Sequence, residues 1–150
     1  MRLAALALTL TVGDISNEAV TITAADTILV AAELMESEGI GALVVEDNGT
    51  VEGLITDREI ALAVADHEGD LSAVTVEEVM TEDVVLLEDT QDSLAAANEM
   101  AQQGVRRMPV VDSTDSLVGI VILDDVVALA GEQLADAATV IEHQSPDYEP

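Results

Sequence analysis

The hydrophobic residues of this 150-residue chain follow two periods. Short apolar runs of four to six residues are typical of buried strands, and apolar residues three or four apart are typical of one face of a helix. The order of these patterns is strand, helix, strand, strand, helix, and the whole order occurs twice along the chain. The pattern therefore predicts an α/β fold made of two similar βαββα units.

The first unit is predicted to open with a strand at residues 20–23 and a helix behind it. Asp26 or Thr27 is suited to cap this helix, because either side chain can accept hydrogen bonds from its first free N–H groups. Apolar residues then recur at helical spacing, and Gly39 is expected to end the helix. Met35 belongs to the buried face of this helix.

A hairpin and a second helix complete the unit. Residues 42–45 and 51–55 are predicted as the two strands, because Asp47-Asn48-Gly49 between them is a strong turn sequence. Acidic residues from Asp57 onward suit the N-terminal end of the closing helix. A strand–helix–strand segment favours a parallel pair and the hairpin adds an antiparallel neighbour, so each unit is expected to hold a small mixed sheet with helices on one face.

The second unit is an internal repeat of the first. A shift of 65 places aligns Met35 with Met100 and Gly39 with Gly104, and a shift of 64 aligns Asp14-Ile15 with Glu78-Val79. The two copies are expected to pack about a pseudo-two-fold axis. The second unit is predicted to contain strands at 84–87, 108–111 and 117–122 and helices at 93–103 and from 124. A helix at 126–141 is expected to close this unit or to pack on another chain. The expected divisions are an N-terminal extension at 1–10, the copies at 11–68 and 69–141, and a flexible tail at 142–150.

The net charge of the chain indicates the kind of solution in which it folds. The chain has 31 acidic residues against 4 basic ones, all arginine, and its formal net charge is −27. In dilute buffer such a chain repels itself, whereas at ~1 M salt the Debye length falls to roughly 3 Å and the repulsion is screened. The composition therefore predicts a protein of a salt-rich, halophilic cytoplasm.

The same composition argues against several functions. With no cysteine and two isolated histidines, the sequence lacks thiolate chemistry and any spacing typical of a metal site. Clustered Lys and Arg, which nucleic-acid binding needs, are missing as well. The apolar run at residues 3–10 is too short to span a membrane. No paired catalytic residues or glycine-rich phosphate loop are found, so an enzyme is disfavoured.

Two segments resemble the CBS domain family. They are Gly53-Leu54-Ile55-Thr56-Asp57-Arg58-Glu59-Ile60 in the first copy and Gly104-Val105-Arg106-Arg107-Met108-Pro109-Val110-Val111-Asp112 in the second. The resemblance implies a tandem pair, or Bateman module, that binds an adenine compound such as AMP, ADP, ATP or S-adenosylmethionine in clefts between the copies, with or without magnesium. It implies a cytoplasmic, non-enzymatic sensor that needs no cofactor, forms a disc-like homodimer and reports to a separate effector protein.

The resemblance also implies binding residues. Thr56 and Glu59 are carried over as contacts to ribose and phosphate in the first copy, and Asp125 in the second. Glu59 replaces the usual Asp, and Ile122 stands where a hydroxyl is expected, so one competent site is expected more readily than two. The aliphatic side chains of Ile22, Leu43 and Val44 are suited to clamp a purine, because no aromatic residue precedes Tyr148.

Three of the four arginines fall inside these motifs, at Arg58, Arg106 and Arg107. An arginine fork can hold a phosphate bidentately, so these residues are expected to face one phosphate group, with Met108 and Pro109 at the cleft. The alternative is that the arginines only pair with carboxylates such as Asp57 or Asp112. A second alternative for the whole module is a ligand-free scaffold for dimerisation or partner docking. For the disc-like dimer that the resemblance implies, the helices at 60–64 and 126–130 are the candidate contact faces.

Overall fold

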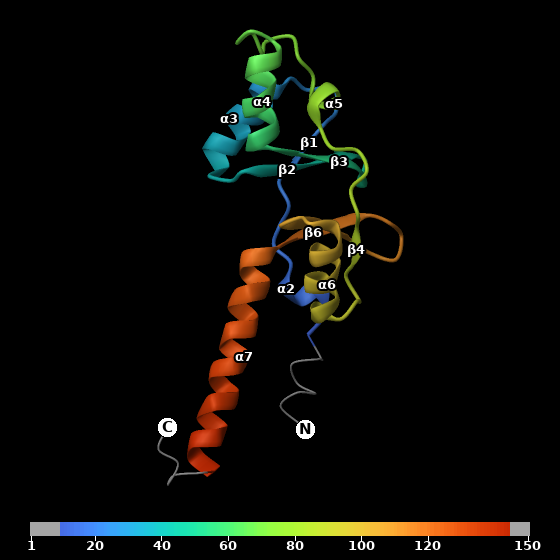
Figure 1. The fold of residues 1–150 in the computed structure, drawn as a ribbon. Coiled ribbons are helices and arrows are strands. Elements are labelled where there is room, and N and C mark those ends of the chain that lie inside the picture. The colour runs from blue at the N-terminus through green and yellow to red at the C-terminus, as the bar shows by residue number, and fades with distance from the viewer. Residues whose placement is uncertain (1–9, 145–150) are drawn as a thin grey trace.

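Figure 1 shows the computed structural model of the chain, which describes residues 10–144. The first copy contains β1 (Thr21–Ile22), α3 (Ile28–Glu38), β2 (Ala42–Asp47), β3 (Thr50–Thr56) and α4 (Asp57–Asp66). Its sheet has the order β1-β2-β3, with β1 parallel and β3 antiparallel to β2. The predicted α/β class, element order and mixed sheet are confirmed.

Local sequence explains the turns of this copy. Thr27 caps α3, with its hydroxyl accepting a hydrogen bond from the Val30 N–H at 3.3 Å, whereas Asp26 bonds to Thr23. Gly39 ends α3 with a φ of 67°. In the hairpin, Asn48 and Gly49 take φ values of 50° and 87°, the left-handed pair that a tight two-residue turn needs.

The second copy contains β4 (Leu87–Glu88), α6 (Ser93–Gln103), β5 (Arg107–Val111), β6 (Leu117–Ile122) and α7 (Leu123–Gln144). Strand β4 lies three residues later than the predicted strand at 84–87, because only Leu87 and Glu88 come into register with β5. Helix α7 continues through residues 142–144, where a flexible tail was expected. Residues 1–9 of the expected extension at 1–10 and residues 145–150 of the expected tail lie outside the described residues.

Two short helices are exchanged between the copies. Helix α2 (Val12–Ile15) lies before β1, at the start of the first copy in sequence, yet Val12 is buried in the core of the second copy, beside Leu87 and Met100. Helix α5 (Val76–Val79) lies before β4, in the sequence of the second copy, yet Val76 is buried in the core of the first copy, beside Ile28. The offset of 64 that relates Asp14-Ile15 to Glu78-Val79 therefore relates two helices that cross over.

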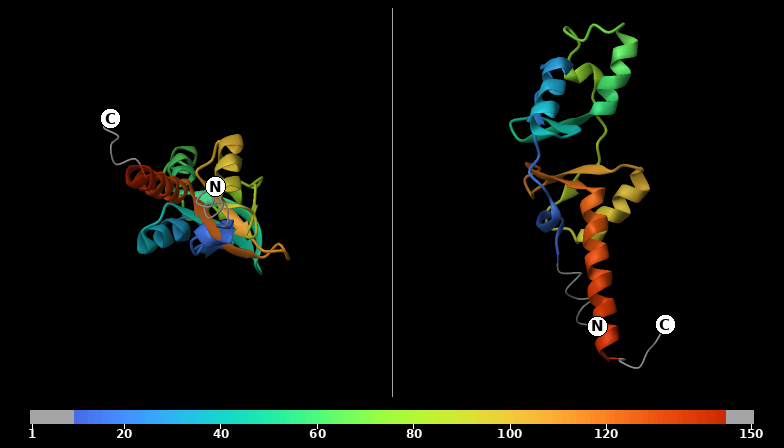
Figure 2. Two further views of the ribbon diagram at one scale, coloured as in Figure 1. Left: turned by 90° about the horizontal axis from the view of Figure 1, so that it is seen from below. Right: turned by 90° about the vertical axis from the view of Figure 1, so that its left-hand side faces the viewer.

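The two sheets face each other at the centre of the molecule, and the helices lie on the outer sides (Figures 1 and 2). Two crossing segments join the halves through paired backbone hydrogen bonds, Leu54 with Thr81 at 2.9 and 3.0 Å and Asn17 with Ile120 at 2.8 and 2.9 Å. Gly53 and Gly119 permit these crossings, because an added Cβ would lie 2.6 Å and 2.7 Å from the carbonyl oxygens of Thr81 and Asn17.

No helix within residues 10–144 combines the length and apolar character that a membrane crossing requires.

Candidate functional site

Two pockets lie where the copies meet, and they occupy equivalent positions of the repeat. The Thr56 pocket has a volume of about 360 Å³ and the Ile122 pocket about 420 Å³, both within the range of small-molecule sites. Each is formed by the end of one hairpin, the segment that crosses it and the loop before the other hairpin. The Thr56 pocket is lined by Leu54, Thr56, Asp57, Arg58, Glu59, Thr81, Asp83, Val84, Val85, Gln103, Gly104, Val105, Arg106, Arg107 and Met108.

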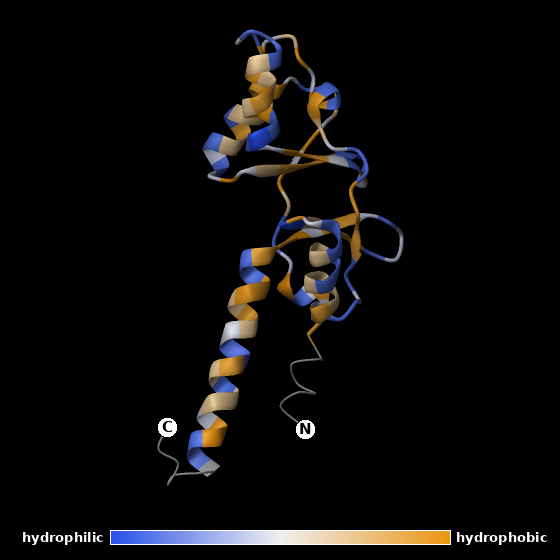
Figure 3. Ribbon diagram, viewed as in Figure 1, coloured by the Kyte–Doolittle hydropathy of each residue, from blue (hydrophilic) through white to orange (hydrophobic). Residues whose placement is uncertain are grey.

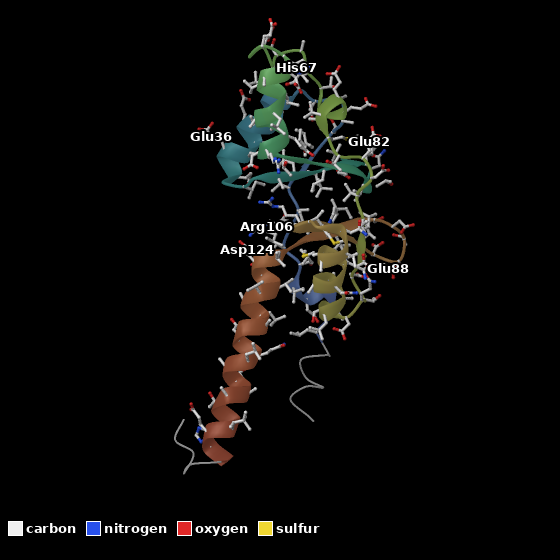
Figure 4. All side chains as sticks on the ribbon, in the orientation of Figure 1. Glu36, His67, Glu82, Glu88, Arg106 and Asp124 are labelled. Atoms are coloured by element: carbon white, nitrogen blue, oxygen red, sulfur yellow. The ribbon has the colours of Figure 1, made fainter. Side chains whose placement is uncertain are left out.

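The Thr56 pocket brings together the three motif arginines. Arg58 comes from the first turn of α4, whereas Arg106 and Arg107 precede and begin β5 in the other copy. Arg106 forms an ion pair with Asp124 at 3.0 Å, and both side chains are 71% exposed (Figure 4). It is the one ion pair within residues 10–144, and exposed pairs of this kind contribute little stability. The carboxylate partner is thus neither of the two residues considered from the sequence, Asp57 and Asp112.

Thr56 and Glu59 are held rigidly at the start of α4. The Thr56 hydroxyl accepts from the Glu59 N–H at 3.4 Å, and Glu59 Oε2 accepts from the Thr56 N–H at 2.9 Å, which makes a capping box. The Thr81 hydroxyl donates to the other oxygen of Glu59. A carboxylate has about four acceptor positions, so Glu59 can still accept a further hydrogen bond from a ligand hydroxyl.

The Ile122 pocket has a different chemistry. It is lined by Asn17, Glu18, Val20, Gly39, Ile40, Gly41, Ala42, Val44, Arg107, Ile120 and Ile122, so Arg107 is its one cation. Asp125, the second carried-over acid, accepts from the Asn17 amide at 2.5 Å, in the position where Glu59 meets Thr81 in the first copy. Ile122 offers no hydroxyl here.

Arg107 lines both pockets and lies on the boundary between them. A Cβ added to Gly41 would lie 3.6 Å from Arg107 Nη2 and 2.8 Å from Asp57 Oδ2, so this glycine leaves room for both side chains. Arg107 is half-buried, whereas Arg58 and Arg106 are exposed. One guanidinium therefore borders both pockets.

Four of the residues proposed from the sequence line neither pocket: Ile22, Leu43, Pro109 and Asp125. Leu43 is fully buried in the core of the first copy and Ile22 lies beside it, because alternate residues of β2 point toward the helices. Val44 points the other way and lines the Ile122 pocket. Pro109 is buried opposite Ile120 in the hairpin and lines neither pocket. The aliphatic walls of the Thr56 pocket are instead Leu54, Val84, Val85, Val105 and Met108.

Sequence reasoning missed the crossing segments as parts of the site. Thr81, Asp83 and Val84 line one pocket, and Asn17 and Val20, the equivalents of Thr81 and Val84 at an offset of 64, line the other. The match between Asp14-Ile15 and Glu78-Val79 was the one sequence feature that pointed to these segments.

The fold and pockets define a class of protein: two intertwined βαββα copies with a small-molecule pocket on each side of their junction. The family model described as CBS domain matches the chain twice, at residues 12–66 and 76–132. The chain belongs to the CBS domain family and forms a CBS domain pair.

Known relatives agree with this assignment. The chain is 35% identical over 132 residues to the CBS domain-containing protein YhcV of Bacillus subtilis, covering 87% of this chain and 93% of the relative. It is 34% identical over 122 residues to a homoserine O-acetyltransferase of Methanococcoides burtonii, covering 80% of this chain and 24% of that enzyme. The part shared with the enzyme is therefore a minor fraction of the enzyme.

Among solved structures, the CBS domain pair of protein MJ0100 was crystallised in complex with 5′-methylthioadenosine and S-adenosyl-L-methionine. It is 30% identical, with a TM-score of 0.71 over 83% of this chain and 98% of that one. The fold of a regulatory CBS pair is thus shared with a protein that holds adenosine compounds.

Proposed function

We propose that this CBS pair is a non-catalytic sensor that binds an adenine nucleotide, AMP, ADP or ATP, or S-adenosylmethionine, in the Thr56 pocket. The observation that carries the proposal is that three arginines line this one pocket in a chain of net charge −27. A polyanionic ligand needs local positive charge to approach such a chain, and arginine provides a fork that fits phosphate oxygens. The relative that binds adenosine compounds supports the same ligand class.

Each part of a nucleotide has a complementary part of this pocket. Glu59 and the Thr56 and Thr81 hydroxyls suit a ribose diol, since a carboxylate accepts and hydroxyls do both. Val84, Val105 and Met108 supply aliphatic surface for a purine. A magnesium ion would accompany the phosphates of ADP or ATP, with Asp57 and Asp83 as nearby carboxylates.

The Ile122 pocket is proposed as the weaker site. It lacks the hydroxyl at position 122, and its one cation, Arg107, is shared with the Thr56 pocket. When Arg107 holds a phosphate group in the Thr56 pocket, its guanidinium is no longer available to a ligand in the Ile122 pocket. We therefore expect one ligand per chain.

The output of the sensor is proposed to pass to a separate effector protein, and the sensor is proposed to work as a homodimer in a salt-rich cytoplasm. Leu62 and Val64 on α4, 57% and 42% exposed, and Val127 on α7, 60% exposed, are apolar candidates for the contact. The acidic surface supports the salt-rich setting.

Calorimetric titration in concentrated KCl tests the proposal, with AMP, ADP, ATP and S-adenosylmethionine as ligands. We expect saturable binding of at least one ligand at one site per chain, weakened at least about tenfold by Arg107→Ala or Arg58→Ala, because a charge-assisted hydrogen bond contributes about 1.5–3 kcal/mol. Ala135→Glu is the control, since it makes the same change in net charge on an exposed face of α7. No binding of any of the four would favour the ligand-free scaffold instead.

A further inference from the structure

Helix α7 carries an apolar stripe that is exposed along most of its length. The helix leaves the body of the molecule and projects beyond it (Figures 1 and 2). Val127, Leu134 and Ile141 are 60%, 72% and 61% exposed, and Ala130 and Ala137 between them are exposed as well. Nothing within the described residues covers this stripe.

The spacing of the stripe is that of a coiled-coil seam. The five residues follow one another at intervals of three, four, three and four, which are the a and d positions of a heptad. Figure 3 shows apolar and hydrophilic positions alternating down the exposed length of the helix. A stripe with this spacing stays on one side of a helix and fits against one other helix.

Beyond the first turn of α7, its charged residues avoid this side. In a heptad the e and g positions flank the seam, and here they are all uncharged from residue 126 to residue 140: Val126, Gly131, Gln133, Ala138 and Val140. The acidic residues beyond the first turn, Glu132, Asp136 and Glu142, occupy the outer positions f, c and b. The helix thus keeps a neutral face in a chain of net charge −27.

We infer that this face pairs with α7 of a second copy of the chain. A second copy brings the same charge of −27, so two copies can meet only where neither presents carboxylates, and this face fulfils that condition. A partner chosen for positive charge would be expected to find acidic residues at the flanking e and g positions, and residues 126–140 offer none there.

The sizes of the side chains favour an antiparallel pair. The a positions are large, Val127, Leu134 and Ile141, whereas the d positions are Ala130 and Ala137. A parallel pair would stack leucine on leucine and alanine on alanine, which gives layers of unequal width. In the antiparallel pair Leu134 lies beside Ala130 of the partner subunit and Val127 beside Ala137 of the partner subunit, so each of these layers combines one large and one small residue.

This inference rests on the proposed homodimer and not on nucleotide binding. Light scattering in concentrated KCl tests it with Ala137→Glu, which places a carboxylate in the seam, and Ala135→Glu, which places one on the exposed outer side. We expect Ala137→Glu to weaken association at least about tenfold and to halve the molar mass at a fixed concentration, and Ala135→Glu to leave it unchanged. The calorimetric titration is unaffected by this result, so the two proposals fail independently.

Three results would overturn the inference. An assembly that keeps its mass in Ala137→Glu but loses it in Leu62→Glu would place the dimer contact on α4. A monomeric wild type would refute the homodimer altogether. A monomer that dimerises when residues 2–9 are deleted would show that the apolar N-terminal run, and not a second copy, occupies the stripe.

Direction is tested with introduced cysteines, since the chain has none of its own. An antiparallel pair forms a disulfide between a Val127→Cys chain and an Ala137→Cys chain in a mixture, and neither variant forms one alone. Disulfide formation by Val127→Cys alone would show a parallel pair and contradict the antiparallel arrangement.

Discussion

At the scale of single residues, Glu59 shows why a departure from a family pattern can have a local cause. The family places Asp at this position, but here the longer side chain reaches back to the Thr56 N–H and completes the capping box of α4. Glutamate is a common residue at the third helical position for this reason. The same side chain bonds to Thr81 of the crossing segment, so it joins the start of a helix to the wall of the pocket.

Asp112 offers a test of the hairpin turn of the second copy. Its carboxylate accepts hydrogen bonds from the Thr114 hydroxyl at 2.6 Å and from the N–H groups of Thr114 and Ser116 at 2.8 and 3.2 Å. These bonds favour the ionised form and hold the pKa of Asp112 below its usual value of 3.8, the Thr114 hydroxyl having the largest effect. The turn's stabilisation is therefore present above pH 3.8 and is lost as the pH falls through the lowered pKa.

We expect Thr114→Val to raise the pKa of Asp112 toward 3.8, because the valine keeps the shape and loses the donor. Carboxyl chemical shifts followed by NMR through an acid titration measure this change. An unchanged pKa in the variant would assign the shift to the backbone donors alone.

At the scale of elements, the exchange of α2 and α5 predicts which copy is destabilised by a substitution in either helix. Val12 and Val76 are both fully buried and lie 64 residues apart in equivalent helices. Removing two buried methyl groups costs about 2 kcal/mol, from lost transfer energy and the cavity that remains. We expect Val12→Ala to loosen the second copy, β4 to α7, although residue 12 belongs to the first copy in sequence.

Hydrogen exchange followed by mass spectrometry measures this effect, and Val76→Ala is the matched variant that should loosen β1 to α4 instead. Faster exchange in the first copy of Val12→Ala would contradict the exchanged arrangement.

The long elements could be predicted from the sequence, whereas helices α2 and α5 and the place of β4 could not. Helix α6 and strand β6 have the predicted bounds, because their periodicity, the Gly104 end and the hairpin turn all agree. Helices α2 and α5 have four residues each, too few to show a period. The run 84–87 has the composition of a strand, but Thr81 pairs with the other copy at Leu54, so the chain meets β5 only at Leu87.

The candidate site was predictable in its arginines and less so in its acidic and apolar residues. Arginines in a chain this acidic stand out, and Arg58, Arg106 and Arg107 line one pocket. Which face of β2 points toward a pocket depends on the register with its neighbours, and that register places Leu43 in the core and Val44 at the Ile122 pocket.

At the scale of the whole molecule, the charge of −27 predicts a strong dependence of stability on salt. Screening weakens the repulsion between carboxylates on one surface, so a gain of a few kcal/mol between dilute and concentrated KCl would raise the Tm by about 10 °C. Thermal unfolding followed by circular dichroism measures the shift. Glycine betaine at equal osmolality is the control, and an equal Tm rise in betaine would mean that screening is not the cause.

The exchanged helices also limit how a two-copy protein of this kind can evolve. A single copy cut out of the chain would lose the helix that completes its core and would present another helix with no core to fill. Two identical single copies could complete each other only by trading these helices, as the protomers of a domain-swapped dimer do. Gene duplication followed by fusion turns such a dimer into one polypeptide, and the smallest segment that can then be transplanted between proteins is the pair.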